Sequence, residues 1–157
     1  MLFLNIKMVY CIMNKRINLS KVSPEAYEAM IGLESYIAKS GLDKKLYELI
    51  KTRTSQLNGC AYCINMHTRD AMKLGETPQR LFLLDAWRET ELYSERERAV
   101  LALTEEMTLI AGRHVSDDVY NEAAKHLTDK ELAAVIMSVV AINGWNRISI
   151  TAQSPLD

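Results

Sequence analysis

The chain has 157 residues, of which 48% are hydrophobic and 25% are charged, and its formal net charge is −1. This length suits one domain with a single core, and the near-zero charge argues against binding to nucleic acid or to an anionic membrane. Three cysteines are too few, and odd in number, for a secreted scaffold held together by disulfides. We therefore expect a cytoplasmic protein.

The chain is predicted to consist of an N-terminal extension, residues 1–22, and one domain, residues 23–157. The apolar start, residues 1–13, is interrupted by polar side chains and is too short to span a membrane. A translation start at Met8 or Met13 is an alternative.

Six to eight helices are expected, because capping residues recur along the chain and no strand-like alternation is sustained. The expected helices run from Ser23 to Gly41, Asp43 to Asn58, Cys60 to Gly75, Thr77 to Trp87, Ser94 to Gly112, a short one from Ser116, and a long one from Thr128 through Ile142. Ser94 with Glu97, and Thr128 with Glu131, form capping boxes. Packing residues are expected to include Met66, Met72, Leu74 and Ile110.

The long helix is apolar on nearly all sides from Leu132 to Ile142. A helix of this kind lies in the centre of a core or is buried against another subunit. The fold class predicted is therefore all-α, a single-domain helical bundle that forms an oligomer.

Chemistry is concentrated in the motif C-x2-C-x3-H formed by Cys60, Cys63 and His67. On a helix these three residues share one face, since residues three and four apart are neighbours. The preceding Asn58-Gly59 pair ends one helix, so both cysteines fall at the start of the next. The backbone N–H groups and the helix dipole stabilise an anion there, and a thiolate is such an anion.

The magnitude of this effect decides whether a cysteine reacts. A thiol with a pKa of about 8.5 is only roughly 3% ionised at pH 7, and a drop of about two units makes most of it reactive. A second thiol one turn away can close a disulfide. Together the two have the parts of a cycle of attack, sulfenic acid, disulfide and re-reduction.

Other interpretations of the motif remain open. Structural zinc needs four ligands, and only Cys11, His114, His126 or a carboxylate could complete the set. The cysteines could also be core residues beside a hydrogen-bonded histidine. Covalent haem attachment is excluded because Ile64, not histidine, follows the second cysteine, and a thioredoxin-type domain would need strands that are absent from the pattern.

A wider pattern includes Glu48, which precedes Cys60 in the order E-x11-C-x2-C-x3-H, and the words Ser55-Gln-Leu-Asn-Gly and Ile142-Asn-Gly-Trp-Asn-Arg. From about residue 24 to 150 the chain resembles the AhpD-like alkylhydroperoxidase core of the carboxymuconolactone decarboxylase superfamily. The resemblance implies an all-helical fold, reduction of hydroperoxides by the two thiols, and assembly into trimers or hexamers.

The resemblance also implies a role for each residue of the motif. Cys63 would attack the peroxide, and Cys60 would supply a proton and then form the disulfide. Glu48 and His67 would form the proton relay, with Glu48 as the ultimate base. The catalytic set is therefore Glu48, Cys60, Cys63 and His67, with a redox-active disulfide, no metal and no other cofactor, and an unknown dithiol or protein as reductant.

One position departs from the family. Tyr62 stands where the best-known members carry histidine, and a phenol, with a reference pKa of about 10, supplies a proton less readily near pH 7. Two consequences are compatible with this departure: a slower peroxidase, or a proton relay that runs through Glu48 and His67 alone. Two other functions stay as alternatives: a lactone decarboxylase like other members of the superfamily, which does not need the two cysteines, and a non-catalytic helical module with structural or metal-binding thiols.

Several further residues have two interpretations. Aromatic and methionine side chains could line a substrate pocket but are expected mostly in the core; they are Tyr62, Trp87, Trp145, Met66 and Met72. Two arginines near the motif, Arg53 and Arg69, could hold an anion but are expected in salt bridges. Two asparagines near the C-terminus, Asn143 and Asn146, are expected at a subunit contact.

Overall fold

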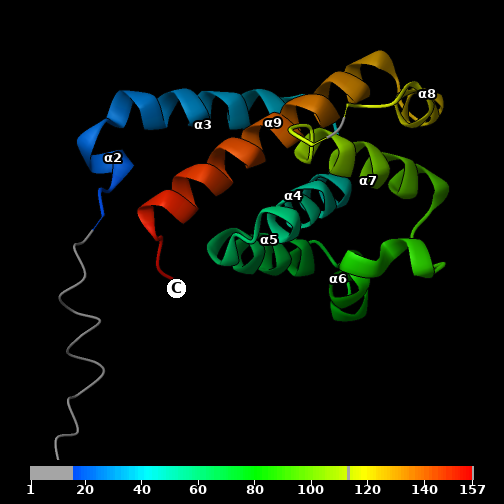
Figure 1. Ribbon diagram of the computed structural model, residues 1–157, viewed down its shortest axis with the longest axis horizontal. Helices are drawn as coiled ribbons and strands as arrows, with labels where there is room; N and C mark the ends of the chain where they lie inside the picture. The colour runs from blue at the N-terminus through cyan, green and yellow to red at the C-terminus, as the bar shows by residue number, and fades with distance from the viewer. Residues whose placement is uncertain (1–15, 113, 157) are drawn as a thin grey trace, which may run out of the picture.

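The computed structural model describes residues 16–112 and 114–156, and all the regular secondary structure in these ranges is helical. The elements are α2 (Leu19–Val22), α3 (Pro24–Lys39), α4 (Lys44–Asn58), α5 (Ala61–Lys73), α6 (Pro78–Leu83), the 3-10 helix η1 (Leu84–Glu89), α7 (Glu95–Thr108), α8 (Asp117–Lys125) and α9 (Asp129–Ala152). They pack as one domain, which confirms the all-α prediction (Figure 1). Cys11, Met8 and Met13 lie outside the described residues.

The helix ends follow from local chemistry. Both predicted capping boxes are present. The hydroxyls of Ser94 and Thr128 accept from the backbone N–H groups of Glu97 and Glu131, and these glutamate side chains accept from the backbone N–H groups of Ser94 and Thr128. Gly59, at φ +70°, ends α4 in the left-handed region that glycine adopts without strain. The prediction was wrong at the end of α7, which stops at Thr108 and leaves Ile110 58% exposed rather than buried.

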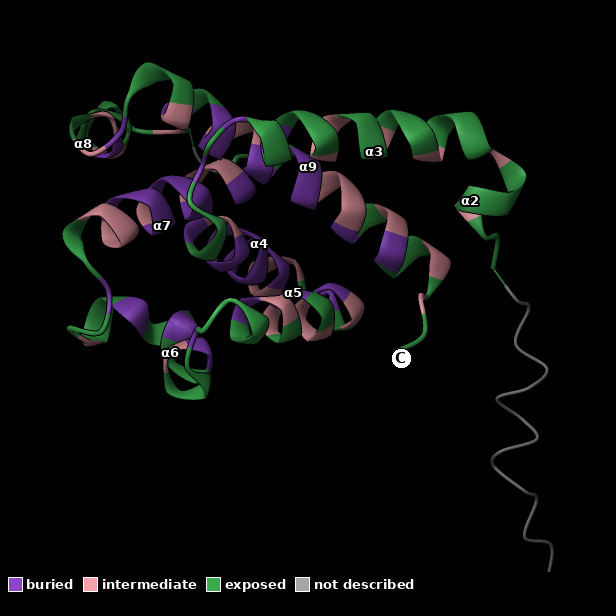
Figure 2. Cartoon of the chain, turned by 180° about the vertical axis from the view of Figure 1, so that it is seen from behind, coloured by how far each residue is buried: buried purple, intermediate pink, exposed green. Residues whose placement is uncertain are grey.

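Helix α4 lies at the centre of the bundle and is buried over most of its length, as Figure 2 shows. It packs against α5, α7 and α9. Because it is surrounded by other helices, its buried charged side chains reach partners instead of water. Arg53, for example, is 7% exposed and donates to Glu105 of α7 at 2.7 Å and also to Asp85 of η1.

Helix α5 turns one narrow face inward. Cys63, His67 and Ala71 are four residues apart and are buried. Met66, Met72 and Leu74, predicted as packing residues, lie off this face and are 36%, 42% and 38% exposed, so that prediction was wrong. The inward face carries the motif.

Helix α9 satisfies the length and hydropathy of a membrane span, and 44% of the apolar window is buried inside the domain. It packs against α3, α4 and α7 through residues such as Val135, Val139 and Ile142. Its opposite side is open, and Val140 is 48% exposed. The helix is apolar on nearly all sides because one side lies in the core and the other presents apolar side chains to the outside. The subunit contact expected on this outer side stays a prediction.

Candidate active site

The two cysteines of the motif are joined and buried. Cys60 and Cys63 form a disulfide with their Cα atoms 5.3 Å apart, and each residue is 1% exposed. Cys60 is the N-cap of α5, where its sulfur accepts from the Cys63 amide N–H at 3.3 Å. The helix start thus places the Cys60 sulfur where the predicted dipole effect is strongest.

Glu48 and His67 come together beside the disulfide. The Glu48 Oε2 atom lies 2.8 Å from His67 Nδ1, and the two residues are 8% and 4% exposed. A histidine that hydrogen-bonds a carboxylate through Nδ1 is fixed in ring orientation and carries a proton at that nitrogen when neutral. His67 Nε2 is buried and has no partner among the described residues, so it is free to take or give a proton.

A pocket of about 210 Å³ is lined by His67 and Cys63. Helix α5 contributes Cys63, His67, Tyr62 and Met66, and the other helices contribute Tyr27, Ile31, Glu34, Lys51, Trp145 and Ser149. Tyr62, Trp145 and Met66 therefore line the pocket, one of the two roles weighed for them. Cys60 is not among the lining residues, so the two sulfurs differ in access: only Cys63 borders the pocket.

The pocket contains an ion pair that sequence reasoning missed. Lys51 Nζ lies 2.7 Å from both Glu34 oxygens, and Lys51 is only 4% exposed. The same carboxylate accepts from Trp145 Nε1 at 2.8 Å and from the Tyr47 hydroxyl. Burial lowers the pKa of Lys51 more than the carboxylates of Glu34 and Glu48 raise it.

A signal for Lys51 existed in the sequence. Lys51 follows Glu48 by three residues, so the two charged side chains share one face of the helix. The partner Glu34 lies on α3 and reaches it only through the fold, so no local pattern could have named it.

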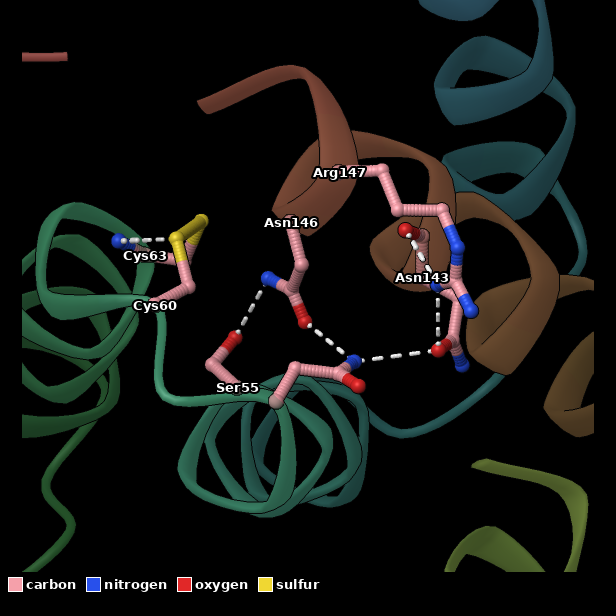
Figure 3. The surroundings of a disulfide bond; sticks show 7 residues. Ser55, Cys60, Cys63, Asn143, Asn146 and Arg147 are labelled. Carbon is pink, nitrogen blue, oxygen red and sulfur yellow. Dashed lines mark hydrogen bonds between the residues drawn. A yellow bond between two sulfur atoms is a disulfide. The ribbon is translucent and has the colours of Figure 1, made fainter. Parts of the chain in front are cut away.

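A network of asparagine side chains holds the last turn of α4, just before Cys60, against α9. The Asn146 amide, fully buried, donates to Ser55 Oγ at 3.0 Å and accepts from Asn58 at 2.9 Å, and Asn58 also donates to Asn143 at 3.0 Å (Figure 3). Ser55 and Asn58 belong to the last turn of α4. The subunit contact expected for these asparagines is therefore wrong for their polar groups, which are paired within the chain.

The remaining candidates lie elsewhere. Trp87 is a core residue that donates to Glu105, Arg53 joins the same cluster, and Arg69 and Met72 are exposed away from the pocket. Over residues 16–112 and 114–156, no group of three or more His, Cys, Asp or Glu side chains is arranged to hold a metal ion.

Comparison with known proteins fixes the family. Residues 24–106 match the model of the carboxymuconolactone decarboxylase family. The chain belongs to this family. Within it, the chain has an AhpD-like core, as the motif around Cys60 and Cys63 indicated.

Three family relatives place the chain more closely. The uncharacterised protein YdfG of Bacillus subtilis (strain 168) is 42% identical over 138 residues, covering 88% of this chain and 94% of the relative. The structure of ATU0492 from Agrobacterium tumefaciens, a protein of unknown function, superposes with a TM-score of 0.88 at 38% identity, covering 92% of this chain and 99% of the other. The alkyl hydroperoxide reductase AhpD of Corynebacterium aurimucosum (strain ATCC 700975 / DSM 44827 / CIP 107346 / CN-1) is 37% identical over 46 residues, which are 29% of this chain and 26% of the relative.

Proposed function

We propose that this protein is a dithiol hydroperoxide reductase that cycles the Cys60–Cys63 pair between dithiol and disulfide. The observation that carries the proposal is the disulfide standing beside the buried Glu48–His67 pair, with Cys63 and His67 opening onto one pocket. The partial similarity to an alkyl hydroperoxide reductase points the same way.

The first half-reaction takes place at Cys63. His67, held by Glu48, takes the thiol proton through Nε2 and leaves a thiolate at the pocket wall. The thiolate attacks one oxygen of the hydroperoxide, the O–O bond breaks, and the products are a sulfenic acid on Cys63 and an alcohol, whose oxygen takes up one proton. Sulfur is oxidised by two electrons and the peroxide is reduced by two.

The second half-reaction closes and reopens the disulfide. The sulfur of Cys60 attacks the sulfenic acid and forms the disulfide. The hydroxide that is displaced takes the Cys60 thiol proton and leaves as water. An external dithiol or protein thiol pair then reduces the disulfide and restores both thiols. Neither step uses a metal or organic cofactor. We expect a cytoplasmic enzyme that forms trimers or hexamers, as the resemblance to the AhpD-like core implies.

Turnover assays test the proposal. Oxidation of a dithiol reductant that depends on added hydroperoxide should be lost in Cys60→Ser and in Cys63→Ser, while both variants keep the helical circular dichroism of the wild type. Undiminished turnover in Cys63→Ser would refute the assignment.

The same samples separate the alternatives. One zinc per reduced chain by elemental analysis would support a metal-binding module, because Cys60, Cys63 and His67 would then be ligands. Decarboxylation of a muconolactone that survives both cysteine substitutions would support the lactone enzyme, whose chemistry needs no thiol.

A further inference from the structure

Cleavage of the O–O bond requires a proton for the departing oxygen. An alkoxide is a poor leaving group in a site that excludes water, and a positioned acid accelerates such a step by about 10² to 10⁴. The hydrogen-bond geometry of the pocket decides which side chain can be that acid.

The thiolate side of the reaction is already assigned. Attack on a peroxide proceeds with sulfur and the two oxygens in line, so the leaving oxygen lies beyond the attacked one and away from the Cys63 wall. His67 belongs to the same helix as Cys63 and takes the proton from its sulfur. The resemblance to the AhpD-like core implies Cys60 as the proton donor. Cys60 does not line the pocket, however, so its thiol has no access to the leaving oxygen.

Lys51 has the features that an acid at this place needs. It lines the pocket from α4, and its ammonium is fixed by both oxygens of Glu34 at 2.7 Å. An ammonium has three N–H donors, and among the described residues Glu34 supplies its only hydrogen-bond acceptors. The Tyr47 ring lies 4.3 Å from the same nitrogen.

Glu34 is suited to orient this donor rather than to compete with it. Burial opposes its ionisation, but Lys51, Tyr47 and Trp145 together hold the pKa of Glu34 below its ordinary value. The carboxylate of Glu34 thus favours the protonated form of Lys51, through its charge and its hydrogen bonds. Burial also lowers the pKa of Lys51, which makes its proton easier to give.

We propose that Lys51 is a catalytic residue of this site, the general acid that protonates the leaving oxygen, with Glu34 as its positioning residue. The inference rests on the proposed hydroperoxide reductase function. In balanced form, the Cys63 thiolate, the hydroperoxide and the Lys51 ammonium give Cys63 sulfenic acid, an alcohol and neutral Lys51. The imidazolium of His67 or solvent then returns the proton to Lys51.

The test compares two oxidants with different leaving groups. An alkyl hydroperoxide, such as tert-butyl hydroperoxide, releases an alkoxide that needs a proton. A peracid, such as peracetic acid, releases a carboxylate that needs none, because the pKa of its conjugate acid is only about 4 to 5. Thiol loss of pre-reduced protein is followed in a single turnover, so that no reductant is required.

Lys51→Arg is the decisive variant, because arginine keeps the charge and the bonds to Glu34 but does not give up its proton near neutral pH. Its rate constant with the alkyl hydroperoxide should fall by about 100-fold, and its rate constant with the peracid by less than about fivefold. Lys51→Met combined with Glu34→Gln should show the same selective loss without leaving a buried charge unpaired.

A matched control excludes a purely structural effect. Tyr62→Phe removes another hydroxyl from the pocket without touching Glu34 or Lys51, and it should not change the ratio of the two rate constants. Equal losses with both oxidants, no loss in Lys51→Arg, or a selective loss in Tyr62→Phe would each overturn the role of Lys51. A wild-type protein whose thiols react with neither oxidant would instead refute the proposed function itself.

Discussion

Replacing Asn146 by alanine should destabilise the protein, because the side chain is fully buried and forms two hydrogen bonds to the last turn of α4. Alanine leaves Ser55 Oγ without its donor and leaves Asn58 with only Asn143 as a side-chain acceptor. An unpaired buried polar group costs about 1–3 kcal/mol. Allowing for the bond that Asn58 keeps, the free energy of unfolding should fall by about 2–4 kcal/mol.

Urea unfolding followed by circular dichroism measures this loss. With a slope of about 2 kcal/mol per molar urea, the midpoint should fall by about 1–2 M. The loss should appear in oxidised and reduced protein alike, because no sulfur atom takes part in the network. Asn121→Ala, on the exposed side of α8, is the control and should stay within about 0.5 kcal/mol of wild type; an equally small loss in Asn146→Ala would refute the reasoning.

Three further predictions concern buried carboxylates. Glu48→Gln should slow alkylation of the reduced protein by iodoacetamide near neutral pH without unfolding it, and an alkylation rate equal to wild type at every pH would rule out the relay. Glu105→Leu should cost about 2–3 kcal/mol, because Trp87 and the buried Arg53 each lose a hydrogen-bond acceptor although Arg53 keeps Asp85; a loss below about 1 kcal/mol in thermal or urea unfolding would contradict this. Burial raises the pKa of Glu105, but hydrogen bonds from Trp87, Arg88 and Arg53 lower it by more. The net effect is a pKa below the ordinary value of 4.5. This contribution to stability is present above pH 4.5 and is lost as the pH falls below it, so the melting temperature of wild type should drop more steeply there than that of Glu105→Gln.

The sequence determined the helices because their signals are local. Capping boxes at Ser94 and Thr128 and the left-handed glycine after α4 act within four residues, and each is where the pattern predicted it. The burial of α5 was harder to predict. Its buried face of Cys63, His67 and Ala71 excludes Met66 and Met72, which helical spacing had favoured for the core.

The motif residues were also readable from the chain. Cys60, Cys63 and His67 follow from helical spacing, and the resemblance to the AhpD-like core added Glu48. The structure supplied the contact that spacing could not, the 2.8 Å bond between Glu48 on α4 and His67 on α5. It also showed that only one of the two sulfurs borders the pocket.

The sequence thus predicted the all-α fold class, the two capping boxes and the end of α4, since each depends on residues within one or two turns of a helix. Tertiary structure alone decided the partners of buried polar groups. Glu34 meets Lys51 across 17 positions, and Asn146 meets Ser55 across 91. A buried charge or amide must be paired wherever the fold brings a partner. The packing of α3 and of α4 against α9, which no local pattern encodes, determined which partner that is.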